Sequence, residues 1–214
     1  MSKSVYSIVL MDDVVSAVDA VAAQNGTSRS NMINRILAQA LGLQTPEDRI
    51  SGIFSSIEDF FDEVNSFKTD FNAGGALINM RTSLQYKYNP CVKYSVEILT
   101  SGKYLGELRV SMRTQNARLV QYLDEFYKLW VKLEQTYVGT SADEYEYTSG
   151  RLFRKLRFPP GLTFQQSGAA IAQYTYLMDD CLKAFFSCLP SYDLAISLAE
   201  NVYRDSLSAE VAKL

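Results

Sequence analysis

The sequence predicts an α+β protein in two parts, a short β-α-α segment followed by a larger domain that combines an antiparallel sheet with helices. Three observations predict this fold class. An apolar, β-branched run at residues 5–10 precedes two stretches with helical periodicity. After Gly74 and Gly75 the hydrophobic period changes from 3.6 to two, and from about residue 116 onward helical periodicity returns.

These patterns divide the chain of 214 residues into three segments. Residues 1–43 form the β-α-α module, residues 44–75 an amphipathic connecting helix with a glycine break, and residues 76–214 the α+β domain. The length is typical of one large domain or two modest ones, and the change of pattern favours two.

Composition indicates a globular protein, with 47% hydrophobic and 21% charged residues. The formal net charge of -3 does not favour nucleic acid as a partner, so binding to it would depend on local features. No apolar run approaches the length of a membrane span, and residues 1–10 lack the features of a signal peptide. We therefore expect a cytoplasmic protein without a membrane partner.

The residues that usually carry catalysis or bind metals are scarce. Histidine is absent, and Cys91, Cys181 and Cys188 form neither an even set nor a CxxC pair. No P-loop and no GxGxxG motif occurs. We expect no catalytic residues, no metal site and no cofactor, and therefore a protein that is not an enzyme.

The first element is predicted to be a short strand over residues 5–10. With a period of two, one face carries Tyr6, Ile8 and Leu10, and the other carries Lys3, Val5, Ser7 and Val9. Asp12 and Asp13 favour the start of a helix there, and Asn25-Gly26 favours its end. The apolar stripe of this helix consists of Val14, Val18, Val21 and Ala22.

A second helix is predicted to begin at Thr27 or Ser28 and to end at Gly42. Its apolar stripe consists of Met32, Ile33, Ile36, Leu37, Ala40 and Leu41. One strand and two helices are too few to close a hydrophobic core, and a lone strand leaves both of its edges unpaired. We therefore expect a homodimer in which two strands pair as an antiparallel ribbon over four helices.

This order of elements, with the Gly-x-Ser-x-Ser sequence of Gly26–Ser30 between the helices, resembles the ribbon-helix-helix family of bacterial, plasmid and phage regulators. CopG-like, Arc-like and MetJ-like repressors belong to this family. The resemblance covers residues 3–43, and its most specific parts are Tyr6–Leu10, Gly26–Ser30 and the apolar Met32-Ile33 pair. It implies a dimer that places its ribbon in the major groove of double-stranded DNA.

The resemblance also implies roles for individual residues. The base-reading positions are Val5, Ser7 and Val9, and the phosphate-binding positions are Lys3, Thr27, Ser28, Arg29 and Ser30. The family usually has polar or basic residues at base-reading positions, whereas two of these three are valine. A second interpretation therefore stays open, in which the module only dimerises and the chain is a structural, partner-binding or antitoxin-like protein.

Beyond residue 44, Thr45 and Pro46 favour the start of a helix whose apolar stripe continues to Phe67. After the glycine break, a three-stranded antiparallel meander is predicted from alternation at residues 78–88, 92–98 and 108–112. A helix at about residues 116–137 is expected to cover its apolar face. An irregular stretch and two further helices are expected to complete the domain.

The polar face of this meander is rich in basic residues. Arg81, Lys87, Lys93, Arg109 and Arg113 outnumber Glu97 and Glu107, and residues 151–157 add further positive charge. Such a face is either a solvated surface or a surface that meets phosphate or an acidic partner. The sequence thus predicts a dimeric, sequence-specific DNA-binding regulator whose second domain oligomerises or binds an effector or protein partner that the sequence does not identify.

Overall fold

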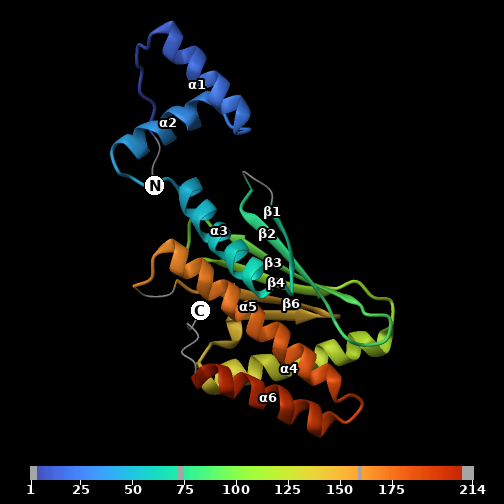
Figure 1. Ribbon diagram of the computed structural model, residues 1–214. Helices are drawn as coiled ribbons and strands as arrows, with labels where there is room; N and C mark the ends of the chain where they lie inside the picture. The colour runs from blue at the N-terminus through green and yellow to red at the C-terminus, as the bar shows by residue number, and fades with distance from the viewer. Residues whose placement is uncertain (1–3, 72–74, 159–160, 209–214) are drawn as a thin grey trace. The chain divides into compact units, whose positions relative to one another are not determined.

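The computed structural model describes residues 4–71, 75–158 and 161–208, and the chain divides into two compact units between Arg49 and Ile50. The first unit contains helices α1 (Asp12–Gln24) and α2 (Arg29–Ala40) and the first turn of α3 (Pro46–Val64), as Figure 1 shows. The second contains the rest of α3, a six-stranded sheet and three long helices. The predicted α+β class is confirmed.

The predicted N-terminal strand is absent from the single chain, in which residues 4–11 have no regular secondary structure. The physical reason is that a strand needs a neighbour for its backbone N–H and C=O groups, and among the described residues none pairs with this segment. The two helices form where the sequence predicted them. Gly26 follows α1 with a φ of 61°, and the Ser28 hydroxyl caps α2 by accepting a hydrogen bond from the Asn31 N–H at 3.3 Å.

The hydrophobic core of the first unit is small. It consists of Val18, Ala22 and Met32, against which Ile33 packs. Many apolar side chains of the same unit stay exposed, namely Val5, Tyr6, Ile8, Val9, Leu10, Met11, Val14, Val21, Ile36, Leu37, Leu41 and Leu43. Few apolar side chains are therefore buried between the two helices, and many stay exposed to solvent.

The second unit is built on a sheet of six strands, in which all neighbours are antiparallel and the order is β1-β2-β3-β4-β6-β5. The strands are β1 (Lys68–Phe71), β2 (Leu77–Ser83), β3 (Cys91–Ile98), β4 (Gly106–Met112), β5 (Tyr145–Thr148) and β6 (Arg151–Leu156). The predicted meander corresponds to β2, β3 and β4. That prediction was incomplete, because three further strands extend the sheet at both edges.

Two elements differ from the prediction for local reasons. The helix expected to continue to Phe67 ends at Val64, because Asn65 adopts a φ of 53° and the chain then enters β1. The stretch expected to be irregular forms the β5–β6 hairpin. Its two-residue turn consists of Ser149 and Gly150, whose φ values of 42° and 77° suit the twist of a tight hairpin.

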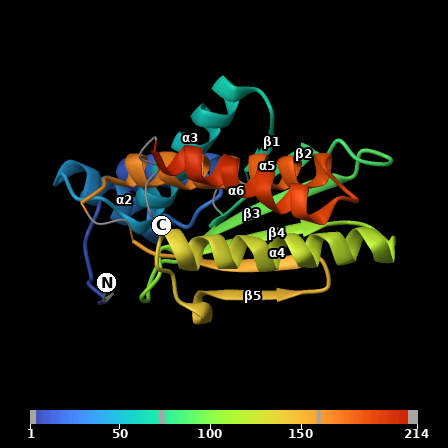
Figure 2. The same cartoon turned by 90° about the horizontal axis from the view of Figure 1, so that it is seen from below.

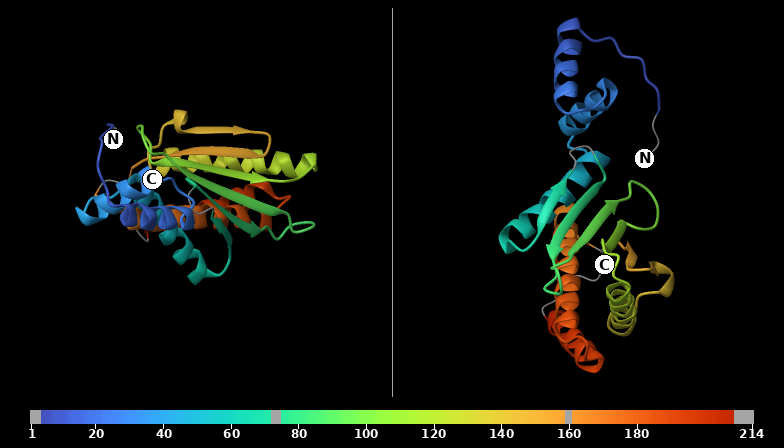
Figure 3. Two further views of the ribbon diagram at one scale, coloured as in Figure 1. Left: turned by 90° about the horizontal axis from the view of Figure 1, so that it is seen from above. Right: turned by 90° about the vertical axis from the view of Figure 1, so that its right-hand side faces the viewer.

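One face of the sheet carries the apolar side chains, and the helices cover it. Helix α3 packs there with α4 (Ala117–Tyr137), α5 (Phe164–Ser187) and α6 (Tyr192–Ser208). Figures 2 and 3 show α4, α5 and α6 on one side of the strands. The Tyr94 hydroxyl of β3 donates to the Asp179 carboxylate of α5 at 3.0 Å, which ties sheet to helix. The opposite face of the sheet carries mainly polar side chains.

A buried ion network lies within this core. The Arg154 guanidinium of β6 donates to the carboxylates of Glu134 on α4 at 3.0 Å and of Glu144 at 2.9 Å, in the short 3-10 helix Ala142–Glu144. The hydroxyls of Tyr145 and Tyr174 also donate to Glu134. Arg154 therefore does not add to a basic surface, contrary to the expectation for residues 151–157, because it points into the protein and is neutralised there.

No helix among residues 4–71, 75–158 and 161–208 is both long and apolar enough to cross a bilayer.

Candidate nucleic-acid interface

The extended segment before α1 shows a period of two in its exposure. Val5 and Val9 are fully exposed, at 99% and 101%, whereas Ile8 and Leu10 are 59% and 38% exposed. Ile8 and Leu10 are thus less exposed to solvent than Val5 and Val9. Ser7 lies two residues away from each valine in sequence. If the segment pairs as a strand, the three predicted base-reading residues would share one face of it.

The predicted phosphate-binding residues gather at the start of α2, except Lys3, which lies outside the described residues. Thr27, Ser28, Arg29 and Ser30 surround the first turn, where backbone N–H groups have no partner within the helix. The Arg29 guanidinium donates to both carboxylate oxygens of Asp19 on α1, at 2.6 and 2.5 Å. This pair lowers the pKa of Asp19, chiefly through the hydrogen bond.

The electrostatic balance of the first unit is close to neutral. Arg35, the other arginine of α2, also contacts a carboxylate, with its Nε at 3.2 Å from Asp48. Asp12 and Asp13 add negative charge in the first turn of α1. A phosphate group that approaches α2 would therefore meet free backbone N–H groups and an arginine already engaged by an aspartate.

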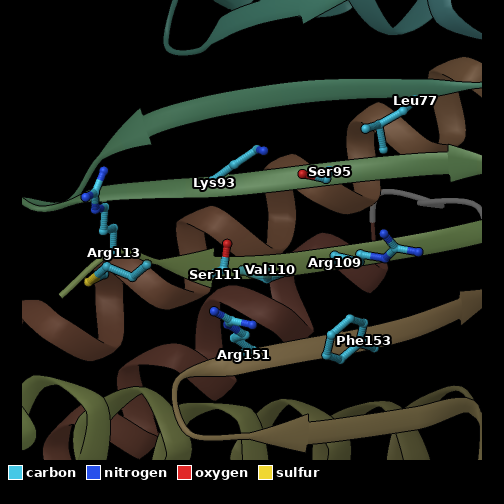
Figure 4. Close-up of a pocket in the computed structure, with 10 residues that line it drawn as sticks. Leu77, Lys93, Ser95, Arg109, Val110, Ser111, Arg113, Arg151 and Phe153 are labelled. Atoms are coloured by element: carbon cyan, nitrogen blue, oxygen red, sulfur yellow. The ribbon is translucent and has the colours of Figure 1, made fainter. Parts of the chain in front are cut away.

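A second candidate surface lies on the polar face of the sheet in the other unit. The strand register places Arg81 opposite Lys93, Lys93 opposite Ser111, and Ser111 opposite Arg151. Directly opposite residues of antiparallel strands point to the same face, with Cβ atoms about 5 Å apart. These side chains therefore form a row across four strands, and Figure 4 shows Lys93, Ser111 and Arg151 in this arrangement.

An open groove of about 600 Å³ is lined by three members of this row, Lys93, Ser111 and Arg151. It is lined by Leu77, Lys93, Ser95, Arg109, Val110, Ser111, Met112, Arg113, Arg151 and Phe153. Figure 4 shows the Arg113 side chain at one end of the groove, Arg151 beside Ser111 nearer its middle, and the Phe153 ring toward the other end. The groove thus combines positive charge, hydroxyl groups and one aromatic ring.

The predicted basic residues of this face differ in their surroundings. Arg109 donates to Glu107 and to Glu97, both at 2.6 Å, and these contacts raise its pKa, with the hydrogen bond to Glu107 the largest cause. Arg81 lies 3.6 Å from Asp70. Lys87 is not on the polar face, because β2 ends at Ser83, and it lines a separate groove of about 260 Å³. Lys93 and Arg113 line the main groove.

Arg151 and Phe153 also line this groove. Arg151 was expected only as part of the positive charge of residues 151–157, and Phe153 was not predicted. The signal that identifies them is the alternation of β6, in which Leu152 and Leu156 are buried and Arg151 and Phe153 point the other way. The turn at Ser149-Gly150 marks the start of that strand. Pairing of β6 with β4 therefore places these two residues beside the central strands of the sheet.

Comparisons of the chain with protein-family models, with curated proteins and with solved structures gave no match. Within the part of the chain that the structure describes, no group of three or more Cys, Asp or Glu side chains is arranged to hold a metal ion.

Proposed function

We propose that the protein is a cytoplasmic, homodimeric regulator of the ribbon-helix-helix type that binds specific sites in double-stranded DNA. The observation that carries this proposal is the extended apolar segment of residues 4–11, which has no partner strand and precedes two helices with exposed apolar faces. A second copy of the module supplies both missing parts. It offers a strand to pair with and a second set of helices to bury those faces.

Pairing of two such segments determines which side chains meet DNA. Tyr6, Ile8 and Leu10 would turn toward the four helices, in keeping with the greater shelter of Ile8 and Leu10 in the single chain. Val5, Ser7 and Val9 would then face the major groove. Ser7 can exchange a hydrogen bond with a base edge, and the valines can contact thymine methyl groups.

The start of α2 supports a phosphate contact. Its free backbone N–H groups and the positive end of the helix dipole favour an anion. Arg29 stands beside this site, but its guanidinium is held by Asp19. A DNA phosphate would have to compete with that carboxylate, so Asp19 is expected to weaken DNA binding and Arg29 to support it.

A second function is favoured by a specific observation. Because Arg29 and Arg35 both contact carboxylates, the module offers little unpaired positive charge to DNA. The same fold would then serve dimerisation alone, in a structural, partner-binding or antitoxin-like protein.

The test that separates these functions is a salt series of binding by the full-length protein to genomic DNA fragments and to a site selected from them. DNA binding through phosphate contacts weakens as salt increases. Ser7→Ala is expected to cost about 1 to 3 kcal/mol on the selected site and little on random DNA. Arg29→Ala is expected to weaken both and to lower the salt slope by about one unit for each lost contact.

Two further variants act as matched controls. Arg35→Ala removes the same charge from the same helix, away from its first turn, and is expected to change DNA affinity less than Arg29→Ala. Asp19→Asn releases Arg29 and is expected to raise affinity for both kinds of DNA. A dimer that ignores DNA at low salt would contradict the DNA-binding proposal and support the second function.

A further inference from the structure

The polar face of the sheet concentrates cations around a single hydroxyl. Ser111 on β4 lies opposite Lys93 on β3 and opposite Arg151 on β6. Arg113 follows directly after the end of β4, and Figure 4 shows its side chain at the edge of the same face. All four residues line the groove of about 600 Å³.

These three cations differ from their basic neighbours in having no carboxylate partner. Arg81 and Arg109 contact acidic residues, whereas the described residues include no ion pair of Lys93, Arg113 or Arg151. Lys93 and Arg151 lie on either side of Ser111, and like charges on one face of a sheet repel each other. A cluster of this kind is stabilised when an anion binds between its members.

The groove also holds an aromatic ring at a defined spacing from the charge. Phe153 follows Arg151 by two residues on β6, so their Cα atoms are about 7 Å apart along the strand. It lies opposite Arg109, whose charge is already balanced by Glu97 and Glu107. The volume of the groove lies within the usual range for sites that bind small molecules.

We propose that this groove binds a nucleoside phosphate. Lys93, Arg113 and Arg151 hold the phosphate with a hydrogen bond from Ser111, and the base stacks on Phe153. This site goes beyond DNA recognition by the N-terminal module and does not depend on it.

Single-stranded nucleic acid would also need cations for its phosphates and aromatic rings for its bases, but in a different arrangement. Proteins that bind such strands present several aromatic side chains in succession. On the strands of the described polar face, Phe153 is the one aromatic residue. The single ring of Phe153 beside the cation cluster suits a ligand with one base and one phosphate group.

Isothermal titration calorimetry of the full-length protein tests the proposal. The probes are AMP, GMP, CMP and UMP, with inorganic phosphate, the corresponding nucleosides and a short single-stranded DNA as comparisons. We expect saturable binding of at least one nucleotide at one site per chain. The matching nucleoside should bind much more weakly, and added salt should weaken nucleotide binding because the contact is ionic.

Substitutions assign the binding to the groove. Arg151→Gln and Lys93→Gln should each reduce nucleotide affinity by at least about tenfold, as expected for loss of a charged hydrogen bond. Phe153→Leu should reduce nucleotide affinity by about tenfold and leave phosphate affinity unchanged. Lys132→Gln is the matched control, because Lys132 is an exposed lysine of α4, on the helical side of the sheet.

Thermal melting of each variant, followed by circular dichroism, separates loss of binding from loss of fold. The proposal is overturned if folded protein binds none of the nucleotides at millimolar concentration, or if the groove variants bind them like the unsubstituted protein. It is also overturned if only single-stranded DNA binds and the groove variants weaken it. None of these results alters the outcome for Ser7→Ala or Arg29→Ala, so the two proposals fail independently.

Discussion

The two units of the chain differ in how far each completes its own interior. In the first unit the buried side chains are Val18, Ala22 and Met32, and apolar residues such as Ile36 and Leu37 stay exposed. In the second, four helices and one face of a six-stranded sheet share a continuous core. The difference teaches that the second unit buries its apolar surface within one chain, whereas the first leaves apolar surface that a second chain would cover in the proposed dimer.

The same contrast holds for charged residues. The ion pair of Arg29 and Asp19 lies at the surface, where solvent screens it. Glu134, Glu144 and Arg154 are buried together, and each has a charged partner. Loss of one member is therefore expected to have very different effects in the two units.

The largest expected effect concerns dimerisation of the first unit. Ile36→Asp places a carboxylate on a side chain that is 43% exposed in the single chain but central to the proposed dimer. Burial of an unpaired charge is strongly unfavourable, so we expect complete loss of dimerisation by the N-terminal module. Sedimentation equilibrium of the full-length protein measures this, and the melting of the second unit should not change.

The control for that change is Asn34→Asp, which adds the same charge to another side of α2 and should leave the dimer intact. If the Ile36→Asp variant dimerises with unchanged affinity, the exposed face of α2 does not form an interface.

A second prediction concerns the buried network. Glu134→Ala removes one of the two carboxylates that contact Arg154, together with an acceptor of the Tyr145 and Tyr174 hydroxyls. We expect the free energy of unfolding to fall by about 3 to 5 kcal/mol, as for other broken buried ion pairs. Denaturant unfolding measures it. Glu125→Ala, in an exposed pair with Lys128, should have little effect, and equal losses in the two variants would refute the contrast.

The smallest predicted effect tests how closely the second unit is packed. A Cβ atom on Gly168 of α5 would lie 2.3 Å from the Ile53 carbonyl oxygen of α3, so Gly168→Ala should destabilise the protein by about 1 to 3 kcal/mol. Gly52 of α3 has room for a Cβ, with its nearest contact at 3.6 Å. Gly52→Ala should therefore stabilise by up to about 1 kcal/mol. Thermal melting of both variants measures these effects. A shift of the melting temperature in the same direction in both variants would contradict this account.

Much of the second unit could be predicted from local patterns. The alternation of Val92, Tyr94 and Val96 with polar residues identified the central strands and their buried face. Strand β1 was missed because Phe67 and Phe71 continue the spacing of the α3 stripe. The conformation of Asn65 decides that boundary, and it does not follow from hydrophobic periodicity.

The candidate sites were predicted less completely, for two physical reasons. Arg151 was expected to add positive charge to the polar face, but strand β6 and Phe153 were not assigned to that face. Arg154 interrupts the buried side of β6 with a charge, and the residues that neutralise it are distant in sequence. The strand at residues 5–10 was predicted but does not form in the single chain. Its backbone partners would come from another molecule, and no pattern within one sequence shows whether they are present.

The buried position of Arg154 has a consequence for the accuracy of strand pairing. Side chains alternate along β6, so a slip of one residue against β4 would exchange its two sides. Phe153 would then enter the core, and Arg154 would lose Glu134 and Glu144 to stand in the groove. Arg154 has carboxylate partners on α4 and in the neighbouring 3-10 helix only in the observed alignment of β6 with β4. Alignments shifted by one residue are therefore unfavourable. The interior charge thereby selects which side chains of the hairpin the groove receives.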